Sequence, residues 1–79
     1  MRIAFASEED NGLDSIVSRK FGRATYFIMV DVEGGNVKSV RTIKNPGAYA
    51  SGGAAIRAVQ ELINNNVDVV VAGGFGPNA

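Results

Sequence analysis

The segment that most constrains the fold of this chain is an amphipathic helix followed directly by an apolar strand. Residues 54–65 place apolar side chains at helical spacing, with charged and amide side chains on the opposite face. The predicted inward face comprises Ala55, Val59, Leu62 and Ile63, with Ile56 beside it. Residues 67–72, apolar after Asp68, predict a strand covered on both faces. Because a right-handed crossover joins parallel strands, the strand before the helix must run the same way.

Apolar and β-branched residues earlier in the chain predict a meander of strands. These strands are expected over residues 3–7, 25–32 and 37–43. Gly34 and Gly35 supply the hairpin turn, and the charges that follow mark an edge strand with one wet face. One helical turn is expected over residues 15–20, after an acidic loop. The long helix is expected to be capped by Ser51 and to end at asparagines 64–66.

The predicted topology brings several loops to one edge of the sheet. The first, third and last strands point the same way, so their carboxyl ends share that edge. Ligands in open α/β sheets bind outside the carboxyl ends of strands. The loops gathered there would be residues 7–14, 18–23, 45–53 and 73–79. We therefore expect an α/β fold with any ligand site at this edge.

The lack of cysteine and histidine removes most metal and nucleophile chemistry. With no Cys, a disulfide scaffold, a thiol nucleophile and thiolate ligation of iron or zinc are excluded. With no His, most catalytic triads and transition-metal sites are excluded as well. Eight basic residues balance eight acidic ones, so we expect no binding to nucleic acid or acidic membranes. With no long apolar stretch or signal pattern, the expected location is cytoplasmic.

Glycine-rich loops and one basic cluster supply the candidate binding residues. The loop over residues 45–53 leads into a helix, whose free N–H groups attract anions. The loop from residue 73 follows a strand directly, where glycine permits close backbone approach to a ligand. Within the basic residues 19–23, arginine presents a fork that suits oxyanions. The candidate cofactor-binding residues are Ser7, Lys20, Arg23, Ser51, Gly52, Gly53, Gly73, Gly74 and Gly76.

Each of these segments also has an ordinary structural explanation. The first loop could be a flexible connector, the second a tight turn, and the basic cluster a solvated surface. The serines have no histidine beside them, and only Lys20 could serve as a base. The first strand, residues 3–7, lacks the carboxylates that a two-metal nuclease needs. We therefore expect no catalytic residue, no metal-ligating residue and no enzymatic activity.

Motifs in order along the whole chain resemble the dinitrogenase iron–molybdenum cofactor biosynthesis family, which includes NifX and the C-terminal domain of NifB. The matching segments are residues 1–7, 12–18, 21–27, 45–46, 51–56 and 76–79. The resemblance implies a ribonuclease-H-like mixed sheet with flanking helices. It also implies a non-enzymatic binding or carrier protein for an iron–molybdenum or related metal–sulfur cluster or its precursor. A cluster-synthesis or acceptor protein would be its partner, and a homodimer is a further expectation.

The chain departs from the family pattern at two places. Lys20 stands where the family usually has His before Phe21-Gly22-Arg23, so a cluster ligand would be lost there. The family normally continues past residues 76–79 into a helix, a strand and another helix. Residues 1–79 are therefore expected to form a single domain without the C-terminal part of the family pattern. Alternatives are an interaction or structural domain without a ligand, a phosphate- or anion-binding module, and an enzyme acting on a phosphorylated metabolite.

Overall fold

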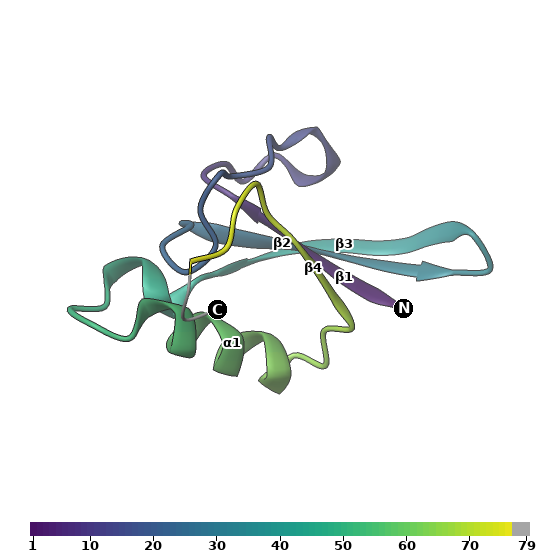
Figure 1. Ribbon diagram of the computed structural model, residues 1–79. Coiled ribbons are helices and arrows are strands. Elements are labelled where there is room, and N and C mark those ends of the chain that lie inside the picture. The colour runs from purple at the N-terminus through teal and green to yellow at the C-terminus, as the bar shows by residue number, and fades with distance from the viewer. Residues whose placement is uncertain (77–79) are drawn as a thin grey trace.

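A four-stranded mixed sheet lies at the centre of the computed structural model, which describes residues 1–76 (Figure 1). The strands are β1 (Arg2–Ser7), β2 (Tyr26–Glu33), β3 (Asn36–Lys44) and β4 (Val69–Val71), in the order β3-β2-β1-β4. β2 is antiparallel to β1 and β3, whereas β4 is parallel to β1. The α/β fold class and the shared direction of β1, β3 and β4 are thus confirmed. Residues 77–79 of the predicted last loop lie outside the described residues.

Within residues 1–76, the remaining elements are one α-helix and two short 3-10 helices. Helix α1 (Ala54–Asn64) crosses from β3 to β4 along one face of the sheet (Figure 1). The 3-10 helices are η1 (Gly12–Asp14), after β1, and η2 (Pro46–Tyr49), after β3. No helix within residues 1–76 is long and apolar enough to cross a membrane.

The hairpin between β2 and β3 follows the prediction closely. Glu33 pairs with Asn36, and Gly34 and Gly35 between them have φ values of 58° and 78°. Only glycine adopts such values without a steric penalty, so these two residues allow the tight turn. β3 is confirmed as an edge strand, since it pairs with β2 alone and most of its side chains are exposed.

The core lies between α1 and the face of the sheet that it covers. Alternation along β1 and β2 sends alternate side chains of each strand to this face. The buried cluster comprises Ala4, Ala6, Phe21, Ala24, Phe27, Met29, Ala58 and Leu62. The small side chains of Ala4 and Ala6 on β1 leave room for the larger rings and for α1.

The predicted inward face of the long helix is confirmed only in part: Leu62 is buried and Val59 packs against the core, as predicted. Ala58 and Leu62 are the buried residues of α1, whereas Ile63 is 65% exposed and Ile56 also faces solvent. The prediction placed the largest apolar side chains inward. Instead, α1 packs against the sheet through the small Ala58 and, one turn later, the larger Leu62. The helix end is confirmed, because Asn66 takes a left-handed conformation with φ 57°.

Three local predictions are also wrong. The segment 15–20 is not a helical turn, because Val17 forms an antiparallel bridge with Ser7 and the backbone there bonds to β1. Ser51 does not cap α1; Gly53 is the N-cap, in a left-handed conformation with no side-chain hydrogen bond. β4 is not covered on both faces, since α1 covers only one face and Val69 is 39% exposed on the other.

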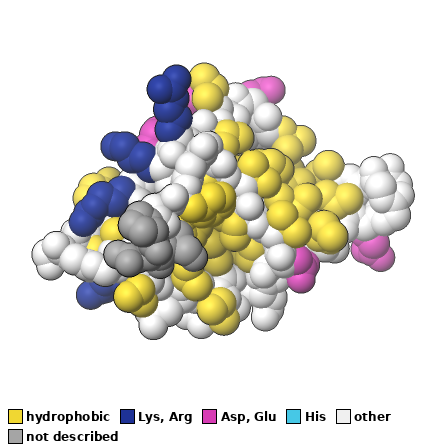
Figure 2. Space-filling view, viewed as in Figure 1, with side chains coloured by type: hydrophobic (Ala, Val, Ile, Leu, Met, Phe, Trp, Pro, Cys, Tyr) yellow, Lys and Arg dark blue, Asp and Glu magenta, His cyan; other side chains and the backbone are white. Residues whose placement is uncertain are grey.

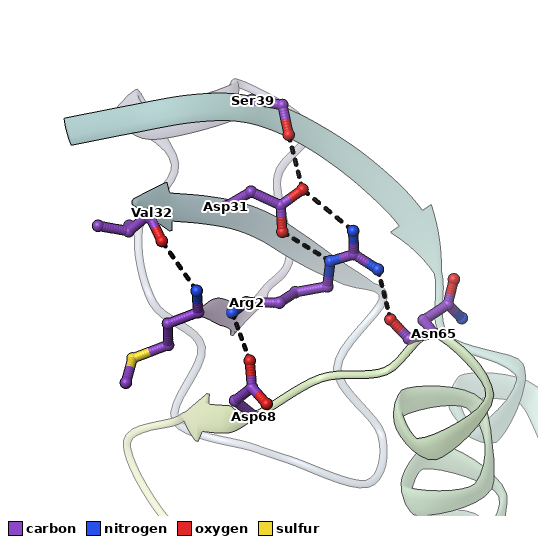
Figure 3. A network of polar contacts seen from close by, with 7 residues as sticks. Arg2, Asp31, Val32, Ser39, Asn65 and Asp68 are labelled. Carbon is purple, nitrogen blue, oxygen red and sulfur yellow. Dashed lines mark hydrogen bonds and ion pairs between the residues drawn. The ribbon is translucent and has the colours of Figure 1, made fainter. Parts of the chain in front are cut away.

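A polar network joins the strands to the end of α1 (Figure 3). The Arg2 guanidinium donates from Nε to Asp31 Oδ1 at 2.6 Å and from Nη1 to the Asn65 carbonyl at 2.6 Å. Ser39 Oγ donates to Asp31 Oδ2 at 2.8 Å, and the backbone N–H of Arg2 donates to Asp68 Oδ2 at 2.7 Å. One arginine thus links β1 to β2 and to the turn that leads into β4.

This network makes the fold sensitive to acid. Hydrogen bonds from Arg2 and then Ser39 lower the pKa of Asp31 from 3.8 to about 2. Because the pKa is lower in the folded state, the ionised carboxylate stabilises the fold at neutral pH. That contribution is lost as the pH falls from about 3.8 through 2.

We predict that Asp31→Asn lowers the thermal midpoint at pH 7, since the carboxylate partner of Arg2 is lost. The variant should then lose less further stability than the wild type between pH 4 and pH 2, a window set by the pKa values of about 3.8 and 2. Thermal unfolding followed by circular dichroism at several pH values measures both effects. Asp10→Asn in an exposed loop is the charge-matched control. An acid transition identical to that of the wild type would contradict the assignment.

Candidate anion-binding site

Two loops and the start of α1 meet in a groove beside the carboxyl ends of β1 and β4. The basic residues 19–23 form one wall, Ala54 and Ala55 at the start of α1 form another, and residues 74–76 after β4 form the third. The groove is shallow and widely open to solvent, with a volume of about 540 Å³. The predicted gathering of the loops 18–23 and 73–79 at one edge is therefore confirmed for their described residues.

Backbone hydrogen bonds set the position of the basic wall. The N–H of Ser18 donates to the Ala6 carbonyl at 2.7 Å, at the end of β1. The carbonyl of Ser18 accepts from the N–H of Gly73 at 2.8 Å, directly after β4. A Cβ atom on Gly73 would lie 2.8 Å from the Cα of Arg19. Gly73 is therefore explained by close packing of two backbone segments.

Asn45 fixes the loop after β3 against the basic wall. Its buried side chain donates from Nδ2 to the carbonyls of Gly22 at 2.9 Å and Ala24 at 2.8 Å, and its Oδ1 accepts from the N–H of Gly47 at 2.9 Å. A Cβ on Gly47 would clash with the backbone oxygens of Ala54 and Gly22. The loop after β3 thus holds the start of α1 beside residues 19–23.

The charged side chains of the groove are exposed cations. Arg19, Lys20 and Arg23 are all exposed, and Nη1 of Arg23 donates to the Ala50 carbonyl at 2.8 Å. Figure 2 shows Lys and Arg side chains along the side of the molecule where these loops gather. The first turn of α1 adds the positive end of the helix dipole, because Ala54 and Ala55 line the groove. The groove is therefore electropositive.

Aromatic rings border the groove next to the cations. Phe21 is buried, whereas Phe75 is 54% exposed, and their ring centroids are 5.1 Å apart. Phe21 also packs on Phe27 of the core at 5.7 Å. Phe21 is thus part of the core, and Phe75 extends the apolar surface toward solvent.

The predicted site residues divide into two sets. Lys20, Arg23, Gly74 and Gly76 line the groove. Ser7 does not, because it is fully buried, donates to the Ile16 carbonyl at 2.8 Å and accepts from the Glu9 N–H at 3.0 Å. The residues Ser51, Gly52, Gly53 and Gly73 are also absent from the lining.

Other lining residues were absent from the predicted set. Arg19 and Phe75 lie within segments that the sequence marked, so each could have been found by reading the whole segment. Ala54 and Ala55 carry no chemical signal in their side chains, and only the fold places them in the groove.

The donors of the groove suit an anion better than a bare metal ion. The sequence contains no Cys or His, and residues 1–76 hold no cluster of three or more potential metal-ligating side chains. What the groove offers is positive charge and N–H donors, which bind anions by hydrogen bonds and charge.

Comparison with known proteins places the chain in a family. The family model described as dinitrogenase iron-molybdenum cofactor matches residues 1–79, so the chain belongs to this family. No curated protein matched the chain.

Solved structures that resemble the chain include the following three. The crystal structure of PH0822 is 34% identical with a TM-score of 0.82, over 100% of this chain and 64% of that one. The apo form of the orange protein from Desulfovibrio gigas is 35% identical with a TM-score of 0.84, over 96% and 61%. A NifB-related protein from Thermotoga is 38% identical with a TM-score of 0.72, over 99% and 63%. The chain therefore spans less than two thirds of the length of these relatives.

We predict that Gly73→Ala destabilises the fold by about 1–3 kcal/mol, because the added methyl group meets the backbone of Arg19. Gly52→Ala is the matched control, since a Cβ there meets nothing within 4 Å. Urea unfolding of both variants measures the free energies. Equal free energies of unfolding for the two variants would contradict the close packing described for Gly73.

Proposed function

We propose that this protein binds an anionic metal–sulfur cluster, or a precursor of one, in the groove and carries it without catalysing a reaction. The observation that carries the proposal is the convergence of Arg19, Lys20 and Arg23 with the start of α1 and a glycine-rich segment. Membership of the iron–molybdenum cofactor family supports the choice of cargo. An acceptor or cluster-synthesis protein would be the partner that receives or supplies it.

Binding would use the outer surface of the cargo. Sulfide groups of a metal–sulfur anion accept hydrogen bonds, so arginine, lysine and backbone N–H donors can hold them without a bond to the metal. Lys20 cannot bind a metal as an ammonium group, but it contributes charge and hydrogen bonds. Such binding weakens with salt and is readily reversible, which suits a carrier.

We predict that the double variant Lys20→Ala/Arg23→Ala binds tetrathiomolybdate at least tenfold more weakly than the wild type. Each lost charge-assisted hydrogen bond is worth about 1.5–3 kcal/mol, and 1.4 kcal/mol corresponds to tenfold. Anaerobic titration calorimetry at fixed ionic strength measures the affinity, because tetrathiomolybdate is a small molybdenum–sulfur dianion.

The control is Lys38→Ala/Arg41→Ala, which removes the same charge from the exposed strand β3. The control should bind like the wild type. If both double variants lose affinity equally, the probe responds to net charge alone and the groove is not the site. If neither loses affinity, the proposed function fails.

A second candidate function, protein interaction, is favoured by the sheet face away from α1. Val40 on β3 and Val69 on β4 are exposed at the two edges of that face, and Ile16 is exposed in the loop beside the buried Ile28 and Val30 between them. Figure 2 shows hydrophobic side chains gathered over the sheet beside β4. Exposed apolar surface of this kind marks sites of association, with a second copy or with an acceptor protein. Analytical ultracentrifugation over a range of protein concentrations distinguishes a homodimer from a monomer that associates with a different protein.

A further inference from the structure

The carboxylate of Glu8 joins the two residues that flank the basic wall of the groove. Glu8 follows β1 directly, and its Oε2 accepts from Ser18 Oγ at 2.7 Å. Its Oε1 accepts from Thr25 Oγ1 at 2.6 Å and from Thr25 N at 3.2 Å. Residues 19–23 therefore lie in a loop whose two ends are held by one side chain.

The contact with Ser18 extends to the first groove residues. Ser18 is buried, and its Oγ also accepts from the backbone N–H of Lys20 at 3.0 Å. The carboxylate thus fixes the orientation of a hydroxyl group that in turn holds the Lys20 backbone. Loss of the carboxylate would free this hydroxyl to rotate and would leave Thr25 without its acceptor.

The charge of Glu8 works against anion binding. Hydrogen bonds from Thr25 and then Ser18 lower the pKa of Glu8, so the group is ionised at neutral pH. Glu8 is absent from the lining of the groove and close enough to Lys20 for a Coulombic interaction. A negative charge near an anion site weakens binding, so any benefit of Glu8 to the anion must come from geometry.

We propose that Glu8 is a positioning residue of the anion site, which holds residues 19–23 in the shape that binds the anion. The inference rests on the proposed function, because it assumes that the groove is the site. The two possible effects of Glu8 change the anion affinity in opposite directions. Charge alone predicts tighter anion binding when Glu8 is removed, whereas positioning predicts weaker binding.

The test compares tetrathiomolybdate affinities of Glu8→Ala, Glu8→Gln and Glu33→Ala with that of the wild type. Glu8→Ala should bind about threefold to tenfold more weakly, although it gains one unit of positive charge. Glu8→Gln keeps an acceptor for Thr25 and should lie between the wild type and Glu8→Ala. Glu33→Ala makes the same charge change in the exposed hairpin and should bind at least as tightly as the wild type. Equal or tighter binding by Glu8→Ala would overturn the proposal.

Amide hydrogen exchange gives a readout that does not depend on the anion. The Lys20 amide should exchange faster in Glu8→Ala than in the wild type, because its acceptor Ser18 Oγ is no longer held. If Glu8→Ala does not fold, Glu8→Gln takes its place in both measurements, because its amide nitrogen cannot accept the hydrogen bond from Ser18 Oγ. If the wild type binds no anion, the proposed function fails and exchange alone decides whether Glu8 positions the loop. Unchanged exchange at Lys20 would then overturn the positioning role.

Discussion

The placement of Ser18 between the ends of β1 and β4 is the contact on which the arrangement of the loops depends. β1 and β4 pair directly from Ile3 and Val69 to Phe5 and Val71. Past this point Ser18 bonds to Ala6 on one side and to Gly73 on the other. The basic segment begins at the next residue, so these two hydrogen bonds fix its starting point at the edge of the sheet.

Much of the fold could be predicted because local sequence and long-range packing agree. The Gly34-Gly35 turn requires positive φ values, and the chain supplies glycine there. The helix over residues 54–64 has a clear apolar period and ends at asparagine, as its dihedral angles require. The crossover rule then determines that β4 runs parallel to β1, which places the loops at one edge.

The remaining predictions failed where tertiary contacts decide. Segment 15–20 looked helical by composition, but its backbone hydrogen bonds go to β1. Ser7 was predicted to bind a ligand at a strand end, yet its buried hydroxyl forms hydrogen bonds with the backbone of Ile16 and Glu9. The structural role of Gly73 could not be predicted either, because the backbone of Arg19, against which it packs, is more than fifty residues away in the sequence. To predict the roles of these residues, one must know which distant segment each of them contacts, and the periodicity of the sequence does not reveal this.

The measurement that tests the central claim most directly is an amide chemical-shift titration of the ¹⁵N-labelled protein with tetrathiomolybdate under anaerobic conditions. Binding in the groove predicts shifts concentrated in residues 19–23, at Ala54 and Ala55, and in residues 74–76. Shifts centred on the exposed cations of β3, or no shifts at saturating probe, would contradict the claim that the groove is the binding site.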